Sequence, residues 1–349
     1  MSWAILLLLG SIWGSSYLFI KVGGAEIPPL TFVAVRVSIA ALALILFILL
    51  RALFKALGEA RTHLRPSSKV GGAEIPPFTF VEGRTLIAAI ALIAVLALRR
   101  ETIPRTRRAW LPLIAMGIFN GVIPYTAITW GETHISSGLA SILTAAMPLF
   151  TVIFAHFWTR DERLTPVKAA GVAVGFIGVV VLFVPELRQG IQIEFWGQFA
   201  VVIAAASYGL ATLIAHKFLG GVSHVMASTG QLASAAIFML PLSLAFDNPF
   251  TLRPSLAAAG SLLILSLLGT AFAYVLYYWL VEHTGATRTA LVTYLIPLTG
   301  VMWGALLLGE SIEWEVVLGL VLIIVGVALV NRQQAPAQRA VMAAQAEGE

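Results

Sequence analysis

The stretch that decides the fold is YTAITWGETH at Tyr125–His134, because a related stretch, YVLYYWLVEH, recurs at Tyr274–His283. Seven positions match between the two halves, the first four at an offset of 149 residues and the last three at 148: Tyr125, Trp130, His134, Pro148, Glu162, Gly171 and Gly178 recur as Tyr274, Trp279, His283, Pro297, Glu310, Gly319 and Gly326. A register kept over about fifty residues indicates that one ancestral unit gave rise to both halves.

Composition makes this an all-α polytopic membrane protein. Of its 349 residues 59% are hydrophobic and only 11% are charged, and the mean hydropathy is +0.92. A soluble domain carries about 25% charged residues. The lipid bilayer is therefore the solvent, and strands are disfavoured because an open sheet cannot satisfy its backbone in lipid. The net charge of +5 suits orientation in a membrane better than nucleic-acid binding, so no nucleic acid is expected as a partner.

The sequence contains eleven long apolar segments that are candidates for membrane spans. They cover residues 3–20, 29–50, 77–98, 110–130, 138–158, 167–185, 196–215, 224–246, 256–280, 287–308 and 315–331. We interpret residues 3–20 as a first span rather than a cleaved signal peptide, because no basic residue precedes the segment.

Basic residues in the connecting segments predict the orientation. If ten segments span the membrane, the main groups of basic residues in the linkers fall on one side of it. They are the cluster from Arg99 to Arg108, the group Arg160, Arg163 and Lys168, and the later Lys217, Arg288 and Arg332. Both termini are then cytoplasmic, in a multi-pass protein of the cell (inner) membrane. Five spans in each half insert the two halves in opposite senses, which is typical of secondary transporters. The expected units are residues 1–190, residues 191–331 and a cytoplasmic tail at 332–349.

A younger, local duplication complicates the first half. Lys21–Arg36 reads KVGGAEIPPLTFVAVR and Lys69–Arg84 reads KVGGAEIPPFTFVEGR, so that thirteen of sixteen positions are identical. The chain thus holds two versions of its second span and one position for it. We predict that one copy lies outside the bundle and that 77–98 spans, since a short linker ties it to the third span. The higher hydrophobicity of 29–50 favours the opposite choice, and an artefact of the gene model is a further alternative.

The residues described so far resemble the EamA-like family of the drug/metabolite transporter superfamily. The resemblance rests on Trp13-Gly14 and Tyr208-Gly209, on Pro-Pro-x-Thr-Phe with an arginine downstream, on Gly138-Leu-Ala-Ser-Ile-Leu before Pro148, and on Glu-x8-Gly-x6-Gly at the end of each half. It covers about residues 1–331. It implies a ten-helix inverted-repeat (5+5) basket with a central cavity, which exports small metabolites or drugs and is often driven by protons. The copied segment is a departure from the family pattern.

Polar residues inside apolar spans are costly in lipid and are therefore candidates for a substrate cavity. The candidates are Trp13, Tyr17, Arg84, Asn120, Tyr125, Tyr208, Gln231, Tyr274 and Tyr294. Arg84 lies about two turns into its span, where a lone cation is costly, so one interpretation is that it binds an anionic substrate group. The alternative for Arg84 is a side chain that reaches the interface or pairs with a neighbour.

Other motifs favour structure over chemistry. Pro148 and Pro297 lie at equivalent places and predict helix kinks, which either shape the basket or act as hinges. Small-residue motifs such as Gly10-x3-Gly14 predict close helix packing, with a homodimer contact of the last helix of each half as an alternative to a scaffold. His134 and His283 have an imidazole that suits a proton carrier, but both lie at span ends, which favours an interpretation as loop histidines. We found no catalytic motif, no metal-binding spacing and no cofactor signature.

Together these features predict a secondary active transporter that works by alternating access. Its expected partners are a small-molecule substrate, lipid and a coupling proton. A channel-like or structural membrane protein is the alternative, since inverted repeats also occur in channels. A membrane-embedded enzyme is disfavoured because the spans lack a nucleophile or paired acidic residues.

Overall fold

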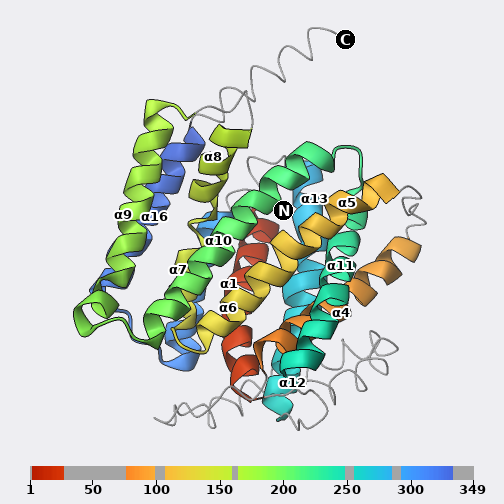
Figure 1. The fold of residues 1–349 in the computed structure, drawn as a ribbon, viewed down its shortest axis with the longest axis horizontal. Helices are drawn as coiled ribbons and strands as arrows, with labels where there is room; N and C mark the ends of the chain where they lie inside the picture. Colours follow the sequence, from red (N-terminus) through yellow and green to blue (C-terminus); the bar gives the residue numbers. More distant parts are fainter. Residues whose placement is uncertain are drawn as a thin grey trace.

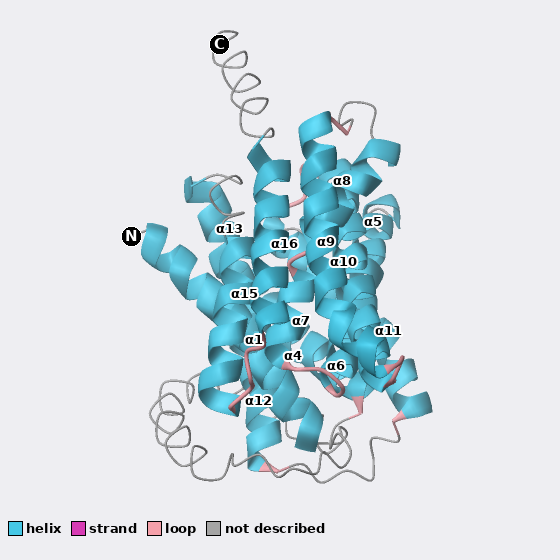
Figure 2. Cartoon of the chain, turned by 90° about the vertical axis from the view of Figure 1, so that its left-hand side faces the viewer, coloured by secondary structure: helices cyan, strands magenta, loops and turns pink. Residues whose placement is uncertain are grey.

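A computed structural model describes residues 2–26, 76–98, 107–158, 164–247, 255–284 and 292–332 of the chain. Within these residues every regular element is a helix (Figures 1 and 2). The elements are α1 (Ser2–Glu26), α4 (Pro77–Leu98), α5 (Arg107–Gly117), η2 (Ile118–Val122), α6 (Ile123–Glu132), α7 (Ser137–Thr144), α8 (Met147–Trp158), α9 (Pro166–Gln189), α10 (Ile193–Phe218), α11 (His224–Phe246), α12 (Leu256–Ser266), η4 (Leu267–Phe272), α13 (Ala273–Thr284), α15 (Val292–Trp303), η5 (Gly304–Leu308) and α16 (Trp314–Arg332).

Length and hydropathy confirm the predicted fold class of an all-α polytopic membrane protein. In the described parts of the chain, nine helical segments are long and apolar enough to cross a bilayer, and Val292–Leu308 is a shorter apolar one. These ten segments correspond to ten of the eleven predicted from the sequence. The eleventh, 29–50, lies outside the described residues, and so does its predicted place beside the bundle.

The second copy of the duplicated segment takes the second position in the bundle, as predicted. It forms α4, which lies beside α11 (Figure 1). At the start of α4 the ring of Phe78 stacks on Phe246, with centroids 5.3 Å apart. Asp247, which follows α11, accepts hydrogen bonds from the Thr79 backbone N–H at 2.6 Å and from the Thr79 hydroxyl at 2.5 Å. Burial raises the pKa of this carboxyl group, and the two bonds from Thr79 oppose the shift.

The last helices of the two halves, α9 and α16, run antiparallel, as an inverted repeat requires. Gly171 lies against Gly326 and Gly178 lies against Gly319, so that the order of contacts reverses between the two helices. A Cβ on Gly171 would lie 2.8 Å from the Gly326 carbonyl oxygen, and one on Gly178 would lie 2.9 Å from that of Gly319. The repeated glycines thus permit a backbone approach that no larger residue allows, which confirms their predicted role in packing.

The first helix of each half packs against the other half. α1 contacts α12, α13 and α15, and α10 contacts α6, α7 and α8. The contacts are equivalent in detail, because Gly14 faces Thr299 and Gly300 while Gly209 faces Phe150 and Thr151, which are the repeat-related positions. The two halves are therefore interlocked, and the space between them is bordered by helices from both.

Two π-helices interrupt equivalent spans. η2 begins eleven residues after the start of α5, and η4 begins eleven residues after the start of α12. A π-helix leaves backbone groups displaced from the regular pattern and is frequent at functional sites. Neither π-helix was expected from the sequence, and both lie at the level where the polar side chains gather.

The repeated Trp-x3-His motif closes a helix end in each half. His134 Nδ1 lies 3.0 Å from the Trp130 carbonyl oxygen, and His283 Nδ1 lies 2.9 Å from that of Trp279. Each imidazole also contacts the indole of its own motif: the His134 ring is tilted by 46° against Trp130 at a centroid distance of 4.6 Å, and the His283 ring stacks on Trp279 at 4.1 Å. A side chain that bonds a terminal carbonyl stabilises the end of a helix, so the motif has a structural role.

Candidate functional site

Arg84 provides a buried positive charge in the middle of the bundle. It lies on α4 with 8% of its surface exposed, and its Nε donates a hydrogen bond to Thr270 Oγ1 at 3.0 Å. Its guanidinium carbon lies 3.8 Å from the centre of the Tyr125 ring. A desolvated guanidinium over an aromatic face is stabilised by about 2 kcal/mol. Arg84 is thus held in place by a neutral hydroxyl and a ring.

Asn120 forms the second polar centre. It lies in η2, and its Nδ2 donates to Gln231 Oε1 at 3.0 Å and to the Tyr274 hydroxyl at 3.2 Å. All three residues were predicted as cavity residues from their polarity within apolar runs. Because the bonds join α11 and α13 to η2, the contact connects the second half of the chain to the first.

The two polar centres are related by the internal repeat. Arg84 and Gln231 each lie seven residues after the first residue of their helix, α4 and α11 respectively. Arg84 bonds to Thr270 in η4, and Gln231 bonds to Asn120 in η2, so each second span reaches the π-helix of the opposite half. The site is thus built twice, with a cation at one position and a neutral amide at the other.

Aromatic side chains surround these two centres. Tyr125 and Tyr208 meet edge to face at 6.5 Å, and Trp13 meets Tyr274 edge to face at 6.4 Å. Tyr17 on α1 is 7% exposed and belongs to the core. The structure therefore brings together aromatic residues from α1, α6, α10 and α13, all of which the sequence singled out.

The remaining predicted residues lie elsewhere. Tyr294 accepts a hydrogen bond from Asn331 Nδ2 at 2.8 Å, so it contacts the end of α16 rather than Arg84 or Asn120. Pro148 follows a break between α7 and α8 at residues 145–146, whereas Pro297 lies within the continuous helix α15. Their assignment as equivalent kinks stays a prediction, and the two halves differ at this point.

A corner of charged residues, which was not expected from the sequence, lies where α6 ends and α7 begins. Lys21 Nζ donates to the backbone oxygens of Glu132 and Ile135 at 2.6 and 2.8 Å. Glu310 accepts hydrogen bonds from Ser137 N at 2.8 Å and from Gly138 N at 3.0 Å, which are the first residues of α7. A carboxylate at a helix N-terminus is stabilised by the unpaired N–H groups and the helix dipole.

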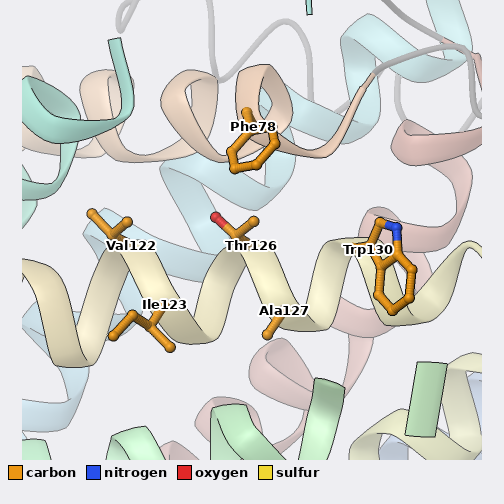
Figure 3. A pocket seen from close by; sticks show the side chains of 6 residues that line it. All are labelled: Phe78, Val122, Ile123, Thr126, Ala127 and Trp130. Carbon is orange, nitrogen blue, oxygen red and sulfur yellow. The ribbon is translucent and has the colours of Figure 1, made fainter. Parts of the chain in front are cut away.

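An apolar groove lies between the start of α4 and the segment formed by η2 and α6 (Figure 3). It has a volume of about 330 Å³ and is lined by Phe78, Val122, Ile123, Thr126, Ala127 and Trp130. None of the nine predicted cavity residues lines it. The polar centres are instead packed between the helices, where their side chains contact one another.

With this geometry in view, comparison with known proteins decides the family. The sequence profile of the EamA-like transporter family matches residues 65–184 and 195–332, once in each half. This chain belongs to the EamA-like transporter family. The first match begins at residue 65 and so includes the copy of the duplicated segment that forms α4. Membership confirms the resemblance and makes the chain a membrane transporter.

Three relatives support the assignment over most of the EamA chain. The transporter YoaV of Bacillus subtilis is 27% identical over 316 residues, covering 90% of this chain and 91% of its own. The inner membrane transporter YedA of Escherichia coli K12 is 25% identical over 323 residues, covering 92% and 87%. A protein of Streptantibioticus cattleyicolor named "Probable terminal-alkyne amino-acid exporter" is 29% identical over 232 residues, covering 66% and 76%.

A solved crystal structure shares the fold of this EamA transporter. The TM-score is 0.51 at 18% sequence identity, and the match covers 79% of this chain and 94% of the solved one. At this identity the likeness bears on the arrangement of the helices alone.

Proposed function

We propose that this transporter exports small solutes with an anionic group, such as amino acids, by proton-coupled alternating access between two inverted halves. Residues 1–190 and 191–331 are the two moving units, and both termini, with the tail at 332–349, are cytoplasmic in the inner membrane. The family membership supports transport, and the relative named as an amino-acid exporter supports the substrate class and the direction.

The observation that carries the proposal is the Arg84 guanidinium. A charge inside a membrane span is expensive and tends to mark a substrate path. In the described residues its direct partners are a hydroxyl and an aromatic ring. Its positive charge is therefore available to a carboxylate, which a guanidinium binds in a bidentate manner. The aromatic residues nearby suit the rest of an amphipathic solute.

The positions of the polar bonds support alternating access. The bonds Arg84–Thr270 and Asn120–Gln231 both join a helix of one half to a helix of the other. A rocking motion of the halves would break such bonds, and a substrate bound between them would replace the lost partners. The π-helices η2 and η4 carry two of the four side chains, so local rearrangement there can change the site without unfolding a span.

Counterflow in proteoliposomes tests this proposal. A panel of radiolabelled L-amino acids should include at least one whose uptake is saturable and is accelerated by unlabelled solute inside. Arg84→Met should reduce this counterflow by about 10- to 100-fold, because a hydrogen bond to a charged group is worth about 1.5–3 kcal/mol. The matched control is Arg188→Met, since Arg188 is exposed near the end of α9.

Two results would contradict the proposal. Conductance without counterflow would indicate a channel, and unchanged counterflow in Arg84→Met would remove Arg84 from the substrate site. Protein levels and size-exclusion profiles of both variants control for misfolding.

A further inference from the structure

Glu132, the last residue of α6, is buried without a hydrogen-bond partner. Its exposed fraction is 1%, and neither carboxyl oxygen has a partner in the described part of the chain. Thr129, one turn earlier on the same face of α6, also has a buried hydroxyl without a partner. Burying a carboxylate that accepts no hydrogen bond is costly, and protonation lowers that cost because it removes the charge.

Charged groups of both signs surround Glu132, so protonation of its carboxyl group changes the net charge of this corner. Lys21 from α1 and Arg84 from α4 attract a negative charge there, and Glu310 repels one. The Tyr17 hydroxyl on α1 is also within electrostatic reach. Lys21 is fixed by its bonds to two backbone oxygens, and Glu310 by its bonds to the start of α7. Glu132 is thus the member of this corner whose carboxyl group is not committed to hydrogen bonds.

We propose that Glu132 is the group that binds the coupling proton, with Lys21 as its counter-charge. This rests on the proposed function and identifies the residue behind its proton coupling. A proton from water on one side of the membrane forms an O–H bond with the carboxylate, and the same bond breaks to return the proton to water on the other side. No redox partner is involved, and the net charge of the corner changes by one unit.

Glu132 is linked to the substrate site through α6. It lies seven residues after Tyr125, which is about two helical turns on the same face, and Tyr125 holds the Arg84 guanidinium. The preceding residue, Gly131, packs so closely on α10 that a Cβ there would lie 2.8 Å from the Gly197 carbonyl oxygen. Movement of α10 during transport would therefore displace the end of α6, and with it the access of water to Glu132.

Infrared difference spectroscopy tests the proposal with protons as the only ligand. The purified full-length protein in liposomes should gain the carbonyl band of one protonated carboxylic acid when the pH is lowered, and the band should shift in D2O. Glu132→Gln should lose this band, and the matched control Glu310→Gln should keep it. A wild type without the band, or Glu132→Gln with the full band, would overturn the proposal.

A second variant covers the case in which Glu132→Gln does not fold. Lys21→Met removes a positive charge beside Glu132, which favours the neutral acid. Its band should therefore appear at a more alkaline pH than that of the wild type. A band that appears at the same pH in both proteins would count against the proposed pairing and overturn it.

Transport measurements distinguish a failure of this proposal from a failure of the proposed function. With one proton coupled, a gradient of one pH unit can raise accumulation of the labelled amino acid by about tenfold. Glu132→Gln should keep counterflow and lose this response, whereas a variant that still responds would refute the role of Glu132. If the wild type shows no counterflow with any amino acid of the panel, the proposed function fails, and the infrared result alone decides whether Glu132 binds the proton.

Discussion

Replacing Gly326 with alanine should separate the last helices of the two halves. A Cβ at this position would lie 2.6 Å from the Gly171 carbonyl oxygen, 2.6 Å from Gly175 N and 2.7 Å from Gly175 Cα. All three atoms belong to the main chain of α9, so no side chain can turn away to make room. The helices must move apart instead.

The size of the effect follows from these distances. Ordinary contacts between carbon atoms begin at about 3.5 Å, so the helices must separate by nearly 1 Å. Overpacking of this kind costs about 1–3 kcal/mol, and the better helix propensity of alanine returns about 1 kcal/mol at most. With the full return from helix propensity, the net loss is about 0–2 kcal/mol. The matched control is Gly260→Ala in α12, since a Cβ there meets nothing within 4 Å, and this change should be neutral or stabilising.

The assay is thermal unfolding in detergent, followed by size-exclusion chromatography with tryptophan fluorescence. Gly326→Ala should unfold at a lower temperature than the wild type, and Gly260→Ala should not. Counterflow of the surviving folded fraction should be normal, because neither α9 nor α16 contributes to the Arg84 or Asn120 centre. If Gly326→Ala is as stable as Gly260→Ala, the close helix contact is wrong.

Two further predictions concern the polar site and the duplicated segment. Tyr17→Ala or Tyr274→Ala should impair transport with little loss of protein in a membrane-fraction blot, and full activity in both variants would exclude them from the cavity. Deleting residues 21–68 joins Ile20 directly to Lys69, which restores a lysine at the place that contacts the Glu132 carbonyl oxygen. The shortened protein should therefore insert and transport. A second change in it, Lys69→Met, should have the same effect as Lys21→Met has in the full chain. If the shortened protein does not fold, the extra segment is an integral part of the structure.

Much of the architecture could be predicted because it depends on local sequence. Long apolar runs give the spans, and the repeated glycines give the contact of α9 with α16. The π-helices η2 and η4 could not be predicted in this way, because one extra residue in a turn leaves no mark on hydrophobic periodicity. The break before Pro148 could not be predicted either, because Pro297 occupies the repeat-related position within a continuous helix.

The candidate site was predicted in part. Arg84, Asn120 and Gln231 were predicted as cavity residues because polar side chains are costly in lipid. In the structure they lie in two repeat-related hydrogen-bonded centres. Glu132 and Lys21 were not predicted, because each lies at the end of a span, where a charge normally faces water. Only the tertiary packing shows that the Glu132 side chain is enclosed.

The two halves should insert into the membrane in opposite senses, and cysteine labelling from either side tests this most directly. The natural chain contains no cysteine, so a single introduced thiol is the only reactive one. Arg163→Cys lies between α8 and α9, and Glu313→Cys lies directly before α16, so each precedes the last helix of its half. A membrane-impermeant maleimide applied to intact cells should label position 313 and should label position 163 only after the membrane is opened. Labelling of both positions from the same side would contradict the inverted arrangement.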